Sequence, residues 1–193
     1  MTDRRPARIA LLGPYGAGKT TLARALSRIS GWPVPAVGPM ANPVHGHVRP
    51  LEQCTLAQVF QLTLRRYGER TRGELEAGHS FISDGSSLHE WIYLLTRARW
   101  AASREEGAAV ANLAEHALDE LVQQLGDRYD VLVHVPVERR LPATSPISGD
   151  FQRLLEATTL EVLASRSVTS IVRAGGSLTA RVRSVTQAVG RHA

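Results

Sequence analysis

The sequence predicts an α/β fold of three layers, with helices on both faces of a five-stranded parallel sheet. Short apolar runs alternate with longer segments of helical period, which is typical of strands joined by right-handed helical crossovers. A glycine-rich turn joins the first apolar run to the first helical segment. The chain has 193 residues, the length of one domain, so we expect a single domain over 1–193.

The first strand and the first helix flank the glycine-rich turn. The strand is predicted over 7–12, and the helix over 19–29 with Gly31 as its stop. The segment 32–50 is rich in proline, and prolines cannot donate to a central ladder. We therefore predict a long loop there with at most a short edge strand.

The rest of the chain continues the alternation. The predicted elements are a helix over 55–76 ended by Gly78, a strand over 81–85, helices over 88–101 and 108–125, a strand over 131–135, a loop over 136–150, a helix over 151–165, a strand over 168–172 and a helix over 178–190. Ser177 is the expected cap of the last helix.

Composition excludes several classes of protein. No apolar run is long enough to span a membrane, and residues 1–8 lack the apolar length of a signal peptide. Cys54 is the single cysteine, so a disulfide framework is excluded and a reducing compartment is expected. We therefore expect a cytoplasmic protein without a membrane partner.

The net charge of +5 is modest, and the arginines are scattered. The only basic cluster with an aromatic residue lies between Arg65 and Arg72, and on a helix its arginines would spread over more than one face among glutamates. A solvated face or a contact with an anionic substrate explains this cluster better than a nucleic-acid partner does.

The turn after the first strand has the pattern of a phosphate-binding loop, or Walker A motif. The segment GPYGAGKT matches G-x-x-x-x-G-K-[ST] between a strand and a helix. Its glycines let successive N–H groups point at phosphate oxygens, Lys19 can reach the β- and γ-phosphates, and the Thr20 hydroxyl can ligate Mg²⁺. The residues predicted to bind ATP here are Gly13, Tyr15, Gly16, Ala17, Gly18, Lys19, Thr20 and Thr21.

Lys19 is the only lysine of the chain. A guanine-specific switch normally uses an Asn-Lys-x-Asp signature, which a chain with this single lysine cannot contain. An ATPase motor of the AAA+ type would have Asp-Glu where Asp84 is followed by Gly85. Both classes are therefore disfavoured.

Asp84 ends the third predicted strand, at the edge of the sheet where ligands bind in open α/β folds. A carboxylate there can ligate Mg²⁺, accept a proton from an attacking hydroxyl, or do both. The alternative is a helix N-cap, formed by Asp84 or by Ser86 or Ser87. The two interpretations are compatible, with Ser86 as the cap and Asp84 as a catalytic residue.

Three arginines follow the fourth predicted strand: Arg139, Arg140 and Arg153. Arginines on a segment over the strand ends can neutralise charge that develops on a transferred phosphoryl group. A solvated loop is the alternative interpretation.

These features resemble the nucleoside and nucleotide kinase group of P-loop proteins, and more narrowly its small AAA-type ATPase and nicotinamide-riboside-kinase-like branch. The resemblance rests on GPYGAGKT, on FISDG, on the arginine-bearing segment, and on a Gly-Gly-Ser turn with Arg181 one turn into the last helix. It extends over nearly the whole chain, although only GPYGAGKT is highly specific.

The resemblance implies roles for three further regions. The last turn would contact adenine through its backbone, at Gly175, Gly176 and Ser177, and a lid would span about 137–153. An acceptor-binding region would span about 32–72. On its helix the residues expected to hold a base or sugar are Gln58, Gln61, Arg65 and Arg66.

Two departures from this family bear on the acceptor. Deoxynucleoside kinases commonly carry a glutamate after the second strand and an Asp-Arg-Ser motif after the third, whereas this chain has VPAVGPMA and Asp84-Gly85-Ser86. The role of proton acceptor therefore falls on Asp84, and the identity of the substrate does not carry over.

The sequence thus predicts an ATP- and Mg²⁺-dependent kinase that acts on a hydroxyl of a nucleoside-like small molecule. A nucleotide, a non-nucleoside metabolite or an antibiotic remains open as the acceptor. A non-catalytic ATP-binding or ATPase regulatory module remains open as the function, and a homodimer as the assembly.

Overall fold

The computed structural model describes residues 7–38, 50–101, 105–141, 145–166 and 171–192. In these residues four parallel strands form one sheet in the order β2-β1-β3-β4. The strands are β1 (Arg8–Leu12), β2 (Phe81–Ser83), β3 (Val131–His134) and β4 (Ile171–Arg173). In β1, Ile9 pairs with Ile82 of β2 on one side and with Val131 of β3 on the other.

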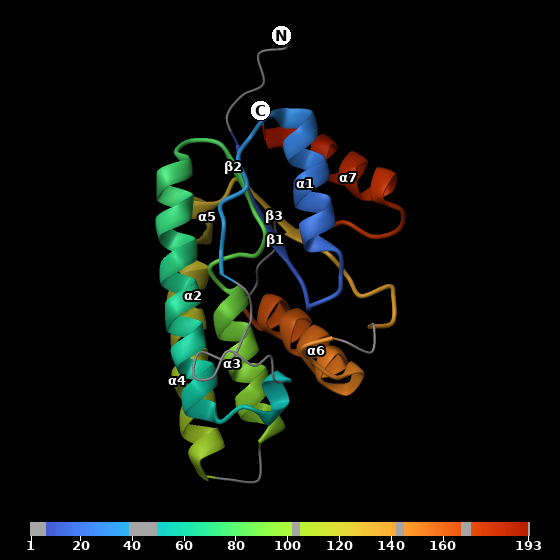
Figure 1. Ribbon diagram of the computed structural model, residues 1–193. Helices are drawn as coiled ribbons and strands as arrows, with labels where there is room; N and C mark the ends of the chain where they lie inside the picture. Colours follow the sequence, from blue (N-terminus) through green and yellow to red (C-terminus); the bar gives the residue numbers. More distant parts are fainter. Residues whose placement is uncertain (1–6, 39–49, 102–104, 142–144, 167–170, 193) are drawn as a thin grey trace.

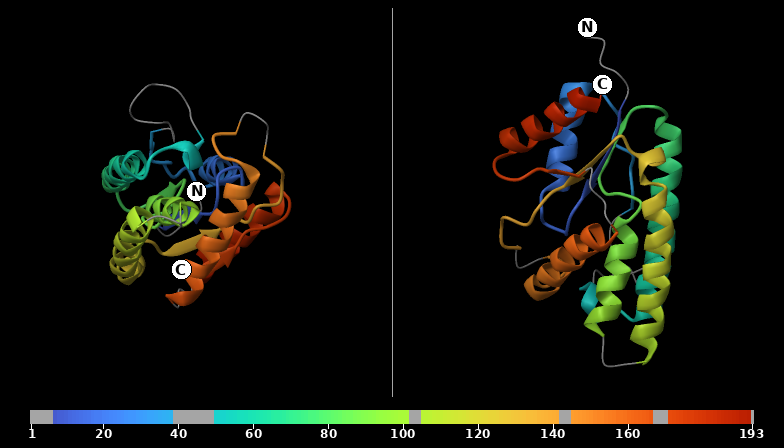
Figure 2. Two further views of the ribbon diagram at one scale, coloured as in Figure 1. Left: turned by 90° about the horizontal axis from the view of Figure 1, so that it is seen from below. Right: turned by 180° about the vertical axis from the view of Figure 1, so that it is seen from behind.

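Helices cover both faces of this sheet (Figures 1 and 2). One face carries α1 (Lys19–Ser30) and α7 (Leu178–His192), and the other carries α3 (His89–Trp100), α4 (Glu105–Gln123) and α6 (Gly149–Ser165). The long helix α2 (Leu56–Ala77) packs against α3 and β2, while η1 (Leu51–Gln53) and α5 (Leu125–Arg128) are short. No helix among the described residues combines the length and the apolar character needed to cross a membrane.

The alternation of side chains along β1 accounts for the two hydrophobic cores. Ile9 and Leu11 lie in the core under α1 and α7, whereas Ala10 and Leu12 lie in the larger core with α3, α4 and α6. All four side chains are buried. The buried central strand thereby fixes the turn that follows it.

The predicted fold class is confirmed, with one correction: the described residues contain four strands and not five. The proline-rich segment 32–38 lies beside β2 but forms no ladder, and Ile82 N donates a single bond of 2.9 Å to Pro33 O. Pro33 and Pro35 have no N–H to continue the pairing. The rest of the predicted loop, 39–49, lies outside the described residues.

Because the strands are parallel, their carboxyl ends share one edge of the sheet. The glycine-rich turn follows β1 there, Asp84 follows β2, residues 136–141 follow β3 and residues 174–177 follow β4. This edge therefore gathers almost every segment that the sequence singled out.

Candidate active site

The turn between β1 and α1 has a backbone that requires glycine. Gly13 has φ +146°, and a side chain there would collide with the carbonyl oxygen of Val135. Gly18, with φ +94°, is the N-cap of α1 and makes no side-chain cap, so the first N–H groups of the helix face the turn. Such a cradle, at the positive end of a helix dipole, fits a phosphate group.

Lys19 lies inside this cradle. Its Nζ donates hydrogen bonds of 2.8 Å to Gly13 O and to Pro14 O, and the residue is 8% exposed. Burial, only partly offset by the charge of Asp84, lowers the pKa of Lys19 to about 8. The ammonium group is thus held where phosphate oxygens would meet it.

The structure brings together the two residues that the sequence predicts as metal ligands. Thr20 Oγ1 donates a hydrogen bond of 2.5 Å to Asp84 Oδ2 at the edge of the sheet. A hydroxyl and a carboxylate are oxygen ligands of the kind that Mg²⁺ prefers, so this pair fits a magnesium ion beside bound phosphates.

A cavity of about 330 Å³ opens beside this pair, between α1, α2 and the segment before α2. Its volume is at the lower end of the range for small-molecule sites. The residues that line it are Thr20, Arg24, Val34, Pro35, Ala36, Val37, Arg66 and Asp84. This cavity is the candidate acceptor site.

A buried ion cluster supports the wall of the cavity. Glu90 accepts hydrogen bonds from Arg66 Nε (2.8 Å) and from Arg70 Nη2 (2.9 Å), and all three side chains are buried. Burial alone would raise the pKa of Glu90, but His89 and the guanidinium groups of Arg66 and Arg70 lower it to about 2. The carboxylate therefore holds Arg66 against the cavity.

The turn after β2 explains why this chain has Gly85 where deoxynucleoside kinases commonly have the arginine of an Asp-Arg-Ser motif. Gly85 has φ +137°, and a side chain there would collide with the guanidinium of Arg70, which reaches the turn from α2. Arg70 Nη1 also donates to Ser83 Oγ at 3.1 Å. An arginine from another element thus fills the space beside Asp84 that an arginine at position 85 would need.

The alternative interpretation of this turn as a side-chain cap is wrong. The N-cap of α3 is Leu88, and no side chain caps it. Asp84 bonds to Thr20 instead, and Ser87 N donates to the hydroxyl of Tyr129 at 2.9 Å. The neighbouring His89 is buried, and burial together with the charge of Lys19 lowers the pKa of His89 well below its ordinary value.

Arg181 ties the predicted adenine turn to the phosphate-binding loop. Its Nη1 donates to Ala17 O at 2.6 Å, and its Nη2 donates to Glu138 Oε2 at 2.8 Å. Glu138 also accepts a bond of 2.7 Å from Gly176 N, and this N–H with Arg181 lowers the pKa of Glu138. The turn 174–177 therefore lies against the loop, and Ser177 caps α7 as predicted, since Ala180 N donates to its Oγ.

The lid arginines are not drawn into the site. Arg139 and Arg140 are exposed, and Arg153 is an exposed residue paired with Asp150 on its own helix. Their predicted role in phosphoryl transfer stays a prediction. Gln152 does contact the loop, because its Nε2 donates to Tyr15 O at 2.8 Å.

Of the four side chains predicted to hold a base or sugar, the structure places Arg66 in the cavity. Gln58 forms the capping box of α2 with Thr55, Gln61 is exposed, and Arg65 is an exposed residue 3.8 Å from Glu69. These three roles stay predictions.

Several side chains at this edge were not among the predicted site residues. Arg24 follows Thr20 by four residues on α1, a spacing that places both on one helix face and could have been read from the sequence. Glu90 looked like an ordinary residue of a first helical turn. Its pairing with Arg66 and Arg70 depends on the packing of α2 against α3, for which the sequence gives no local signal.

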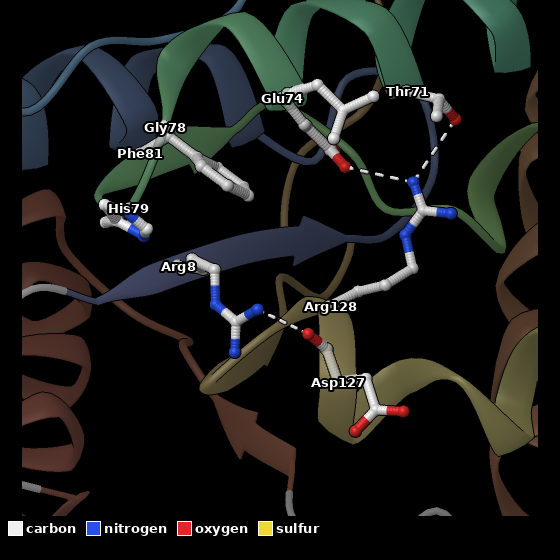
Figure 3. A pocket seen from close by; sticks show the side chains of 9 residues that line it. Arg8, Thr71, Glu74, Gly78, His79, Phe81, Asp127 and Arg128 are labelled. Carbon is white, nitrogen blue, oxygen red and sulfur yellow. Dashed lines mark hydrogen bonds and ion pairs between the residues drawn. The ribbon is translucent and has the colours of Figure 1, made fainter.

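A second cavity, of about 450 Å³, lies at the opposite edge of the sheet, where β1 and β2 begin (Figure 3). Its arginines are already paired. Arg128 bonds to Thr71 and Glu74, and Arg8 to the backbone of Asp127 and to Asp130. This cavity is far along the strands from the phosphate-binding loop and contributes nothing to the site.

Comparison with solved structures finds the same fold in several kinases. No protein-family model matches the sequence, and no curated protein matches it either. Among solved structures, deoxyadenosine kinase from M. mycoides with bound dATP has a TM-score of 0.71 and 15% identity, over 95% of this chain and 99% of that chain. Thymidylate kinase from Candida albicans has a TM-score of 0.67 and 15% identity, over 98% and 94%.

A third similar structure is NadR in complex with NR, with a TM-score of 0.65 and 15% identity. It matches 97% of this chain but 50% of NadR, so the chain spans about half the length of that protein. All three are P-loop nucleoside or nucleotide kinases by fold. The chain therefore has the fold of the P-loop nucleoside and nucleotide kinases.

Proposed function

We propose that the protein is a kinase that transfers the γ-phosphoryl group of ATP to a hydroxyl of a nucleoside or nucleoside-like small molecule. The observation that carries this proposal is the 2.5 Å contact between Thr20 and Asp84, with the phosphate cradle on one side and the cavity of about 330 Å³ on the other. The similar structures support it, since they include deoxyadenosine kinase with dATP and NadR with AMP-PNP.

In this proposal the loop and Lys19 bind the donor phosphates. Thr20 and Asp84 would hold Mg²⁺, which when bound neutralises phosphate charge. Asp84 Oδ2 faces Thr20, which leaves Oδ1 for the acceptor hydroxyl. As the acceptor oxygen bonds to the γ-phosphorus, the bond from that phosphorus to the bridging oxygen breaks, the hydroxyl proton passes to Asp84, and ADP leaves.

Two regions complete the proposal. The segment of about 137–153 acts as a lid, whose Arg139, Arg140 and Arg153 approach the transferred group when donor and acceptor are bound. The region of about 32–72 binds the acceptor. Gly175, Gly176 and Ser177 contact the adenine through the backbone.

The proposal is tested by measuring ATP consumption over a panel of nucleosides, nucleotides and sugars, with the masses of the products recorded. We expect at least one acceptor to gain a phosphoryl group. Lys19→Ala should lower this turnover by at least about 100-fold, because it removes the cation that meets the phosphates. If ATP binds but no acceptor stimulates its consumption, the chain is a non-catalytic ATP-binding module and the proposal fails.

A further inference from the structure

Arg24 is a cation of the cavity that no described residue neutralises. It lies on α1, four residues after Thr20, and lines the cavity with Thr20 and Asp84. Within the part of the chain that the structure describes, its guanidinium has no hydrogen bond or ion pair. The helix KTTLARALSRIS contains no aspartate or glutamate that could pair with it.

The other charges of the cavity are already engaged. Arg66 bonds to Glu90 at 2.8 Å and to the carbonyl of Gly38. Asp84, the only carboxylate among the described residues that line the cavity, accepts the hydroxyl of Thr20. The described residues of the lining thus carry two guanidinium groups and one carboxylate, and the donors of Arg24 have no partner among them.

We propose that the acceptor carries an anionic group, a phosphate or a carboxylate, and that Arg24 binds it. A guanidinium presents paired N–H donors that match the two oxygens of either anion, and a charge-assisted bond of this kind is stronger than a neutral one. The apolar wall from Val34 to Val37 would cover the uncharged part of the molecule. This inference rests on the proposed function, because it names the class of acceptor.

The geometry places the anion beside the reacting group. Thr20 and Arg24 are one helical turn apart, so Arg24 lies about 6 Å along α1 from the Thr20–Asp84 pair. An acceptor hydroxyl at Asp84 and an anion at Arg24 would then belong to one small molecule. A neutral nucleoside would leave Arg24 without its partner.

The test compares Arg24→Gln with Arg28→Gln. Arg28 lies one turn further along α1, is exposed and does not line the cavity, so it is a matched control. The acceptors are three forms of one nucleoside: the free nucleoside, its 5′-monophosphate and its 5′-carboxylate. We expect the wild type to prefer an anionic form and Arg24→Gln to lower kcat/KM for that form by roughly 10- to 100-fold.

The same variant should change kcat/KM for the neutral nucleoside by less than about threefold, and Arg28→Gln should change none of the values. Preference for the monophosphate or for the carboxylate identifies the anion. Preference for the neutral nucleoside, or an equal loss for all three forms, overturns the inference. A rise in KM for ATP alone also overturns it, because Arg24 would then contact the donor.

A binding experiment separates failure of this inference from failure of the proposed function. Calorimetry measures the affinity of the same three compounds for protein saturated with a non-hydrolysable ATP analogue, which fills the phosphate-binding loop. If no phosphoryl transfer occurs but an anionic compound binds and Arg24→Gln weakens that binding, the inference holds and the kinase proposal fails. If no anionic compound binds more tightly than the neutral one, the inference itself is wrong.

Discussion

Gly85 and Arg70 show how one residue shapes the site. Arg70 is 1% exposed, and its guanidinium lies against the backbone of Gly85 in the turn that carries Asp84. The absence of a side chain at position 85 lets α2 approach this turn closely. The position of Asp84 therefore depends on a glycine that takes no part in the chemistry.

Gly85→Ala should destabilise the protein by about 2 to 4 kcal/mol, because the new methyl group meets a buried guanidinium at a backbone angle that disfavours side chains. Urea denaturation measures the change. Gly68→Ala is the matched control, since Gly68 lies in α2 with open space around it and alanine should stabilise the helix by up to about 1 kcal/mol. Equal stability of Gly85→Ala and the wild type would contradict this explanation.

Three elements are held together by a chain of buried polar groups. Glu90 on α3 pairs with Arg66 and Arg70 on α2, and Arg70 bonds to Ser83 on β2. Ser83 Oγ in turn donates to Glu74 Oε1 at 2.6 Å, one turn further along α2. Removing one member of such a cluster leaves the other buried charges unpaired. The free-energy cost of that removal is larger than the net stabilisation that the intact cluster provides.

Glu90→Gln should lower the free energy of unfolding by roughly 3 kcal/mol at pH 7. The pKa of Glu90 is about 2 in the folded protein and near 4.5 when unperturbed, so its contribution is complete above about pH 4.5 and is lost as the pH falls toward 2. The difference in the free energy of unfolding between the wild type and Glu90→Gln should therefore become smaller as the pH falls from about 4.5 toward 2.

Chemical denaturation at several pH values between 7 and 2.5 measures the narrowing. Glu76→Gln is the control, because Glu76 is exposed on the neighbouring helix α2 and should change stability little at any pH. A difference between wild type and Glu90→Gln that stays constant with pH would exclude the titration of Glu90 as its cause.

The helices and strands could be predicted largely from local signals. Helix α2 begins after the Thr55 cap and ends before Gly78, as its apolar period and these two residues indicate. The short edge strand allowed within 32–50 is absent from the described residues, because Pro33 and Pro35 have no N–H with which to continue a ladder beside β2. The predicted helix over 108–125 is in fact α4 followed by the short α5, and the break falls at Gln124, two residues before Gly126.

At the scale of the whole molecule, the parallel sheet brings residues that are far apart in the sequence together in one site. Thr20 and Asp84 are 64 positions apart, and both follow strands that end at one edge. The sequence predicted this pair because each residue lies just after a buried strand. It could not predict the contacts of Glu90 and Arg181, since those depend on how α2, α3 and α7 pack around that edge.

The central claim is that this edge transfers a phosphoryl group. The most direct measurement follows ATP labelled in its γ-phosphate with the wild type and with Asp84→Asn, using the best acceptor of the panel. The wild type should move the label to the acceptor, and Asp84→Asn should slow this transfer by about 100-fold or more while the protein stays folded. Label found only in inorganic phosphate, or an unchanged rate for Asp84→Asn, would contradict the account.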